Sequence, residues 1–530
     1  MKGTIDTRQL APDSILQTHV AIIGGGAAGL TLAKTLANKN YKVSVFEAGG
    51  YATNEDTATL HSTINKGRPY PLLQNSRAFG LGGATRLWGG HCLPMNDRCF
   101  TKRSWISKSE WPFKAHELNP YYKKSHQLLG LEDFEYNPQT IAQQLNKTLL
   151  PFNENLVQTN IARYRAVSYS ELFVNSLQSA SNINMYMFAN ATEILLHENG
   201  KSVAGIKLKT LETNEIVVKA NYYILASGGI ENARLLLDSN SIQTSGIGNS
   251  KDLVGRYFME HIWYPKGNIA LKDPARLNHF YTMQHRLKAK VYTRAHISLA
   301  PEMLQEYHIP EFRSELVAVG MENTTNNTKL SSRDKLELLS LPKDLALQTQ
   351  HIRQSPGLNN QLQKKSFTGY KLMNYVEQVP DFSSRITLSR EKNQLGSHRA
   401  EVHWKLSEID VKGIRVGHQI ISNEVKAKNI GHFFYEDEGI PDNLEGADGG
   451  GHHMGTTRMA RTASNGVVDA NCKVFDVDNL FIAGSSVFPS AGYANPTLTL
   501  TALAIRLATH LDELLQNNSP IELQKSLEKS

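Results

Sequence analysis

The stretch "HVAIIGGGAAGLTLAKTLANKNYKVSVFE", residues 19–47, decides the fold. Its pattern predicts a β-strand, a glycine turn, a helix and a second β-strand in immediate succession. Three glycines follow the spacing G-x-G-x-x-G: Gly24, Gly26 and Gly29. In a strand–turn–helix frame they allow the tight turn, the approach of a pyrophosphate and close packing of helix on strand. The stretch therefore predicts a dinucleotide site with phosphates at the helix N-terminus.

Glu47 indicates which dinucleotide is bound. It ends the second predicted strand, where a carboxylate accepts hydrogen bonds from the ribose hydroxyls. An acidic group at this place disfavours a 2′-phosphate. We therefore expect FAD or NAD rather than NADP.

Composition sets wider limits. The chain has 530 residues, 40% of them hydrophobic, which is enough for two sizeable domains or one domain with insertions. The three cysteines show no CxxC spacing, and the first residues have no apolar export signal, so a cytoplasmic protein is expected. The longest apolar run, "VAIIGGGAAGLTLA", is broken by glycines, which predicts no transmembrane segment.

Charge and histidine spacing exclude two other kinds of site. The net charge is +7, but Lys and Arg are scattered and form no basic stripe, so we expect no nucleic-acid partner. The adjacent His452 and His453 lack a Cys or acidic residue at ligand spacing, and no metal site is predicted.

Further along the chain, residues 183–229 alternate like antiparallel strands with a turn at Asn199-Gly200, and 377–410 predict strands around a turn at Gly396. Residues 331–365 are helix-like and are expected to form an exposed insertion or a lid. A separate glycine-rich segment, "RAFGLGGATRLWGGHC" at 77–92, suits neither a regular helix nor a strand. A backbone without side chains is what a flat ring system needs beside it.

These motifs, in this order, resemble the glucose–methanol–choline (GMC) oxidoreductases, and more closely their pyranose-oxidase-like sugar oxidases and dehydrogenases. The resemblance rests on "GGGAAG" with Glu47, "GLGGATRLWGGHC", "LASGGIENARLLL", "DLVGRYFMEH", "HHMGTTRM" and "NLFIAGSSVFPSAGYANPTLT". It implies an α/β (α+β) fold in which a Rossmann-like FAD-binding domain is interrupted by a substrate domain built on an antiparallel sheet with helices. The FAD domain is expected at 1–100, 185–255 and 445–530, and the substrate domain at 101–184 and 256–444.

The resemblance also assigns site residues. The family's catalytic pair falls on His452 and Asn495, with His452 as base for a CH–OH group whose hydride passes to flavin N5. FAD contacts beyond the first glycine motif are implied at Gly82, Gly83, Thr85, Trp88, Gly89, Gly484, Pro496 and Thr497. Leu87 stands where some relatives carry a histidine bonded to the flavin, so FAD is expected without a covalent link.

Asn495 precedes Pro496 at the start of an apolar helix, where an asparagine is also an ordinary helix cap. The resemblance suggests that Asn495 both caps the helix and holds the substrate hydroxyl, while the helix N-terminus stabilises charge on the reduced flavin. Glu377 and Gln378 are expected to hold sugar hydroxyls, with a solvent-facing strand as an equal alternative. His261 and His453 are expected to be structural.

The expected activity is FAD-dependent oxidation of a CH–OH group, with a sugar or glycoside as the favoured substrate. The electron acceptor is O2, a quinone or a carrier protein, and the sequence does not distinguish an oxidase from a dehydrogenase. The alternatives are an oxidase or dehydrogenase that tailors a natural product such as an aminoglycoside, and a non-redox lyase or binding protein of the same fold.

Overall fold

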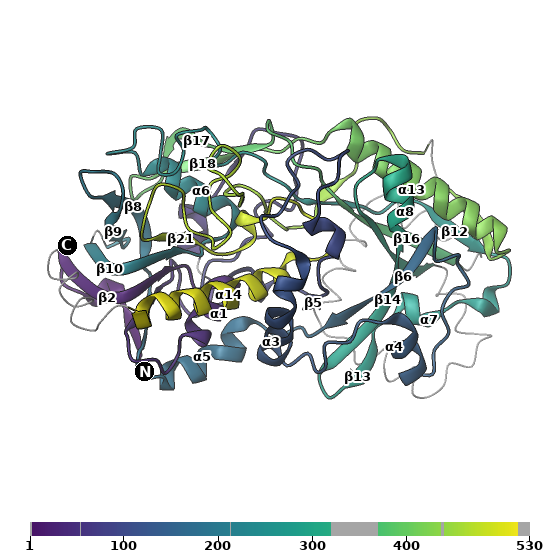
Figure 1. The fold of residues 1–530 in the computed structure, drawn as a ribbon, viewed down its shortest axis with the longest axis horizontal. Helices are drawn as coiled ribbons and strands as arrows, with labels where there is room; N and C mark the ends of the chain where they lie inside the picture. The colour runs from purple at the N-terminus through teal and green to yellow at the C-terminus, as the bar shows by residue number, and fades with distance from the viewer. Residues whose placement is uncertain (1–2, 54, 213, 320–368, 436–438, 518–530) are drawn as a thin grey trace.

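The computed structural model describes residues 3–53, 55–212, 214–319, 369–435 and 439–517. They form two lobes, each built on one large sheet (Figure 1). The predicted insertion at 331–365 lies outside the described residues. Within the described part, no helix is both long and apolar enough to cross a membrane.

The first lobe contains an eight-stranded sheet with a parallel centre and an antiparallel edge. Its strands run in the order β1 (Thr4–Asp6), β7 (Ile183–Met187), β3 (Val43–Phe46), β2 (Ser14–Ile23), β10 (Glu215–Leu225), β9 (Val203–Lys209) and β8 (Asn190–Leu196), and β21 (Leu480–Ile482) also pairs with β10. The pairs from β1 to β10 and the β10–β21 pair are parallel, whereas β8–β9 and β9–β10 are antiparallel. The predicted strand–helix–strand unit is confirmed as β2, α1 (Ala27–Thr35) and β3. The predicted turn at Gly200 joins β8 to β9.

Helices cover this sheet and lead to the second lobe. The helix that follows Asn495 is α14 (Pro496–Asn517), which packs on α1 and on α3 (Asn119–Leu129). α1 also packs on α5 (Tyr169–Ser179). In Figure 1, α14 runs along the first lobe, and the end that begins at Pro496 lies at the junction of the lobes.

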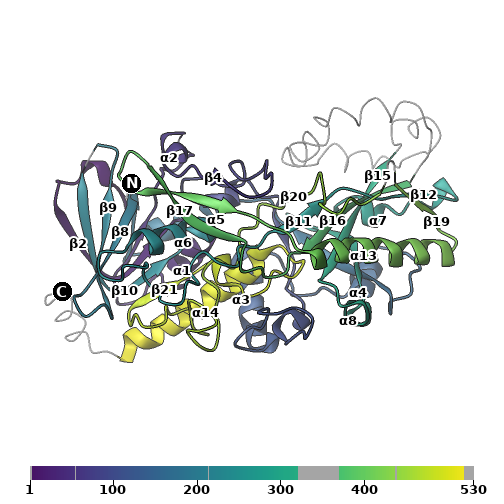
Figure 2. The same cartoon turned by 90° about the horizontal axis from the view of Figure 1, so that it is seen from above.

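The second lobe is built on a ten-stranded antiparallel sheet. Its main order is β19 (Gly431–Phe434), β12 (Asn268–Leu271), β16 (Gly369–Glu377), β15 (Phe312–Val319), β14 (Val291–Leu299), β6 (Val157–Tyr164) and β5 (His91–Cys92). Off this path lie β11 (His261–Tyr264), β20 (Asp448–Gly449) and β13 (His285–Lys288). The long helix α13 (Glu408–Ala427) lies along the sheet (Figure 2).

The two faces of this sheet differ because side chains alternate along each strand. Phe312, Leu316, Leu372 and Val376 point to the face covered by α13 and form the second hydrophobic core with Ile414 and Ile421. The opposite face is polar. Ser298, Arg313 and Tyr375 stand in one row across β14, β15 and β16, and Glu377 lies opposite His261 on β11. This polar row faces the region where the catalytic residues were predicted.

Smaller elements connect the lobes. The predicted strands around Gly396 are confirmed as β17 (Arg385–Lys392) and β18 (His398–His403), which form a small sheet with β4 (Ile64–Asn65). β17 and β18 pack on α6 (Gly228–Asp238) of the first lobe. The shorter helices are α2 (Glu55–Leu60), α4 (Pro138–Gln144), α7 (His279–Thr282) and α8 (Pro301–Tyr307). The domain ranges expected from the sequence stay a prediction.

Candidate active site

The first glycine motif forms a cradle in which side chains have no room. A Cβ on Gly24, whose φ is +111°, would lie 2.6 Å from the carbonyl oxygen of Ala226, and a Cβ on Gly29 would lie 1.9 Å from the carbonyl oxygen of Gly24. Gly26 is the N-cap of α1 and offers no side-chain cap. The first N–H groups of this helix therefore stay available for an anionic phosphate.

The second glycine segment approaches the first backbone to backbone. A Cβ on Gly83 would meet Gly26 Cα at 2.9 Å, and the Gly82 N–H donates to the Gly25 carbonyl at 2.8 Å. A Cβ on Gly484 would meet no atom within 4 Å, so open space lies beside this glycine. The donor set of α1 and this space fit FAD, and the resemblance assigns the glycines to its phosphates and ring.

Glu47 holds the glycine turn in place. Its carboxylate accepts hydrogen bonds from the N–H groups of Gly25 (2.8 Å) and Gly49 (3.0 Å) and is nearly buried. A carboxylate has about four lone-pair sites, so these two bonds leave acceptors for a ribose.

Replacing Glu47 with Ala is expected to reduce FAD retention. The substitution removes both the ribose acceptor and the two bonds that shape the turn. The ratio of flavin to protein absorbance after gel filtration measures the loss, and Glu55→Ala on the surface is the control. A Glu47→Ala protein that keeps its full FAD content would contradict the ribose assignment.

The other residues of the loop that were predicted to contact the flavin differ in burial and in hydrogen bonding. Thr85 is buried and tied to the backbone, since its hydroxyl donates to the Gly82 carbonyl and accepts from the Tyr169 N–H. Trp88 donates its indole N–H to the Val167 carbonyl at 3.1 Å, and Gly89 follows it. Leu87 is 53% exposed. The assignment of these residues to the flavin stays a prediction.

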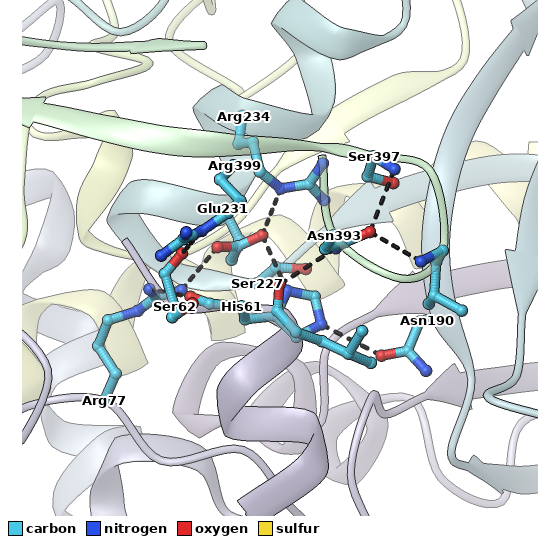
Figure 3. A network of polar contacts seen from close by, with 12 residues as sticks. His61, Ser62, Arg77, Asn190, Ser227, Glu231, Arg234, Asn393, Ser397 and Arg399 are labelled. Atoms are coloured by element: carbon cyan, nitrogen blue, oxygen red, sulfur yellow. Dashed lines mark hydrogen bonds and ion pairs between the residues drawn. The ribbon is translucent and has the colours of Figure 1, made fainter. Parts of the chain in front are cut away.

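A buried polar network anchors the start of this loop (Figure 3). Glu231 of α6 accepts from Arg77 (2.6 Å) and Arg234 (2.6 Å), and also contacts His61 Nδ1 at 3.2 Å. His61 Nε2 contacts the side-chain oxygen of Asn190 at 3.1 Å. The network ties the loop to α6 through Glu231 and to β8 through Asn190, which gives it a structural role.

The two predicted catalytic residues meet. The His452 Nε2 and Asn495 Nδ2 atoms are 3.2 Å apart, although the residues come from different parts of the chain. His452 follows β20 in a segment that pairs with the chain leading into β11, while Asn495 immediately precedes α14. The Asn495 side chain, which the sequence suggested as a helix cap, contacts His452 through Nδ2 and accepts from Arg313 through Oδ1 (3.2 Å).

Two further residues surround this pair. The Nδ1 atoms of His261 and His452 are 2.8 Å apart, and His261 Nε2 lies 3.4 Å from the Ala491 carbonyl. Arg313 is fully buried beneath Asn495 and also reaches His91 Nε2 at 3.4 Å. Sequence reasoning took His261 as structural and did not single out Arg313.

The site keeps its histidines uncharged. Burial, together with the electrostatic effect of the neighbouring His261 ring and of the Arg313 charge, holds the pKa of His452 well below its ordinary value. Burial and Arg313 likewise lower the pKa of His261 to about 4. A neutral His452 has a lone pair on one ring nitrogen and is competent as a general base.

The lowered pKa of His452 gives a pH prediction. The base is lost only when pH falls through its pKa in the folded enzyme, and this pKa lies below the usual value near 6.5. The rate constant of flavin reduction is therefore expected to stay constant between about pH 6 and 7.5. Anaerobic rapid-mixing measurements across this range test it, and a tenfold fall centred near pH 6.5 would contradict it.

Behind the pair lies a second buried cluster. Tyr70 donates to Glu260, His453 Nε2 lies 3.2 Å from Tyr70 Oη, and the pKa of Glu260 is raised to about 8 by burial. His453 has its pKa lowered to about 3 by burial and the charge of Arg77. These contacts turn His453 away from Asn495 and towards the core.

The structure disfavours the predicted substrate contacts of Glu377 and Gln378, which are both fully buried. Arg103 binds both carboxylate oxygens of Glu377, at 2.5 and 2.6 Å. Gln378 accepts from the Glu260 N–H and from the Trp404 indole, and donates to the Lys405 carbonyl. Both side chains join the segments that carry the site, and neither is free to hold a sugar hydroxyl.

Two family models match parts of this chain. The GMC oxidoreductase family model matches residues 380–504, which include His452 and Asn495. The pyridine nucleotide-disulphide oxidoreductase model matches residues 18–247, which include both glycine segments. The chain belongs to the GMC oxidoreductases. It is accordingly an oxidoreductase that acts on CH–OH donors.

Individual relatives of this GMC oxidoreductase are distant. The chain is 22% identical to the 2-methyl-1,2-propanediol dehydrogenase of Mycolicibacterium austroafricanum, over 93% of this chain and 95% of that one. It is 25% identical to the fructose dehydrogenase large subunit of Gluconobacter japonicus, over 62% of this chain and 54% of that one. The crystal structure of pyridoxine 4-oxidase from Mesorbium loti matches 94% of this chain and 99% of its own at 16% identity, with a TM-score of 0.57. This last likeness supports the fold.

Proposed function

We propose that this GMC oxidoreductase oxidises a CH–OH group of a sugar or glycoside to a carbonyl, with FAD held without a covalent bond. One observation carries the proposal: a neutral, partly buried histidine, His452, lies 3.2 Å from the side-chain amide of Asn495. Oxidation of an alcohol needs a group that takes the hydroxyl proton, and an uncharged imidazole does this near neutral pH. Bound FAD would supply the acceptor for the hydrogen on carbon.

The residues around His452 orient the substrate. Its Nε2 lone pair accepts the hydroxyl proton, while the Asn495 amide, held from behind by Arg313, directs the oxygen without competing for that proton. The N–H groups of Thr497 and Leu498 open α14 next to Asn495, where a helix N-terminus offers about half a positive charge. Negative charge that develops beside this end of the helix is thereby stabilised.

The polar face of the ten-stranded sheet supports a substrate with several hydroxyl groups. His91, Arg313 and Tyr375 project from it beside the pair and offer both donors and acceptors. The relative named fructose dehydrogenase large subunit is consistent with a sugar. A polycationic aminoglycoside fits less well, because Arg294 and Arg313 share one carboxylate, Glu315, and leave this region positively charged.

Anaerobic visible spectroscopy of the FAD-loaded enzyme tests the proposal. Matched donors such as glucose, methyl glucoside, fructose and simple diols are mixed with it in turn. We expect a sugar or glycoside to bleach the flavin absorbance, and subsequent admission of air distinguishes an oxidase from a dehydrogenase. Bleaching by simple diols alone would contradict the sugar assignment. Cleavage of a donor while the flavin stays oxidised would establish the lyase alternative.

A further inference from the structure

The catalytic pair is the centre of a longer hydrogen-bonded chain. Its members, in order, are Arg313 Nη1, the Asn495 side chain, the His452 ring, the His261 ring and the Ala491 carbonyl. The contacts along it measure 3.2, 3.2, 2.8 and 3.4 Å. His261 is 1% exposed, so bulk water does not replace its contacts.

The two ends of this chain fix its direction. A guanidinium can only donate, and a backbone carbonyl can only accept. Asn495 Oδ1 therefore accepts from Arg313, and Nδ2 is the atom that faces His452. At the other end His261 carries its proton on Nε2, which donates to Ala491, and leaves a lone pair on Nδ1.

Only one neutral form of His452 satisfies both neighbours. Asn495 Nδ2 donates to His452 Nε2, so Nε2 carries the lone pair. His261 Nδ1 has a lone pair and accepts a hydrogen bond. His452 Nδ1 must therefore carry a proton and donate it to this bond. Two donors or two acceptors facing each other at 2.8 Å between the rings would be repulsive.

We propose that His261 is a positioning residue that fixes the tautomer of His452, so that Nε2, on the side of Asn495, is the atom that takes the substrate proton. This inference rests on the proposed function, since it names the residue that prepares its base. When the hydroxyl proton moves to Nε2, the Nδ1–H of His452 still has its acceptor on His261. The positive charge that forms on the ring is thus stabilised by the Nδ1–H hydrogen bond to His261.

The backbone is built to keep the two rings together. One carboxylate oxygen of Glu260 accepts from the N–H groups of both His452 (2.8 Å) and His261 (3.2 Å). The ring planes cross at 77° with centroids 4.9 Å apart, which suits an edge-on contact through the nitrogens. The contact between the two rings therefore depends on the backbone positions that Glu260 holds, as well as on the side-chain rotamers.

Two variants of the FAD-loaded enzyme test the role of His261 in activity. His261→Phe keeps a flat ring but removes the acceptor, whereas in His261→Asn the amide oxygen replaces Nδ1. We expect the limiting rate of flavin reduction to fall about 100-fold in His261→Phe and by less than about tenfold in His261→Asn. The dissociation constant of the donor should change by less than about threefold in both.

The outcomes separate positioning from structure. Equal losses in both variants, or a loss that appears in donor affinity or FAD content, would show a merely structural role and overturn the inference. A normal rate in His261→Phe would overturn it as well.

A second measurement needs neither a substrate nor a variant of His261. Nitrogen NMR of the wild-type holoenzyme with 15N-labelled histidine reports which ring nitrogen is protonated, and the signal missing from His452→Gln identifies His452. We expect the proton on Nδ1 at pH 7, and a proton on Nε2 would overturn the inference. If no alcohol reduces the flavin, the proposed function fails, and this NMR result alone decides the tautomer.

Discussion

Replacement of His452 with alanine should leave FAD bound and lower the rate of flavin reduction by about 1,000-fold. The variant loses the lone pair that takes the hydroxyl proton, and general-base catalysis contributes about 10²- to 10⁴-fold. FAD should remain because the cradle is formed by the glycine segments and Glu47, and His452 is not part of it. The measurement is the anaerobic reduction rate together with the flavin content of the purified variant.

His453→Gln is the matched control for this experiment. His453 is the next residue in the chain and is likewise a partly buried neutral histidine, but its ring contacts Tyr70 and Ser76 instead of Asn495. We expect its reduction rate to stay within about tenfold of the wild type. If His453→Gln lost activity and His452→Ala stayed active, His453 and not His452 would be the general base.

The sequence was sufficient for those parts of the site that depend on local pattern. Gly24, Gly26 and Gly29 could be predicted because their spacing reflects a turn within one strand–helix unit. The meeting of His452 and Asn495 followed from family motifs, since the residues that lie between them in the chain carry no pattern that implies contact.

The partner of His452 could not be predicted in the same way. His261 reaches it because the segment around Met454 pairs antiparallel with that around Met259, a register set by tertiary packing. A single histidine at the start of a strand gives no signal of such pairing. Arg313 was missed for a related reason: alternation along β15 shows that it shares a face with Glu315, but not which lobe that face meets.

Glu377 shows why a strand-like pattern does not by itself identify a contact. It was expected either to hold sugar hydroxyls or to lie on a solvent-facing strand, and the structure places it at the end of β16 in the interior. Arg103, which lies far away in the chain, instead pairs with it in the interior. Burial and Arg103 act in opposite directions on the pKa of Glu377, and the net result is a lowered pKa. The group is therefore a buried carboxylate at neutral pH, and its stability depends on its partner.

Replacement of Glu377 with glutamine is therefore expected to destabilise the protein by about 3–5 kcal/mol, because it leaves the Arg103 charge buried and unpaired. Denaturant unfolding followed by flavin and tryptophan fluorescence measures this loss. Glu391→Gln is the control, since its ion pair with Arg399 is at the surface and is worth less than about 1 kcal/mol. The double variant Arg103→Met/Glu377→Leu should recover part of the loss, because it removes both charges from the interior. A Glu377→Gln protein of normal stability that binds the donor more weakly would instead support the substrate contact. Removal of a carboxylate that binds sugar lowers the affinity for the sugar and leaves the free energy of unfolding unchanged.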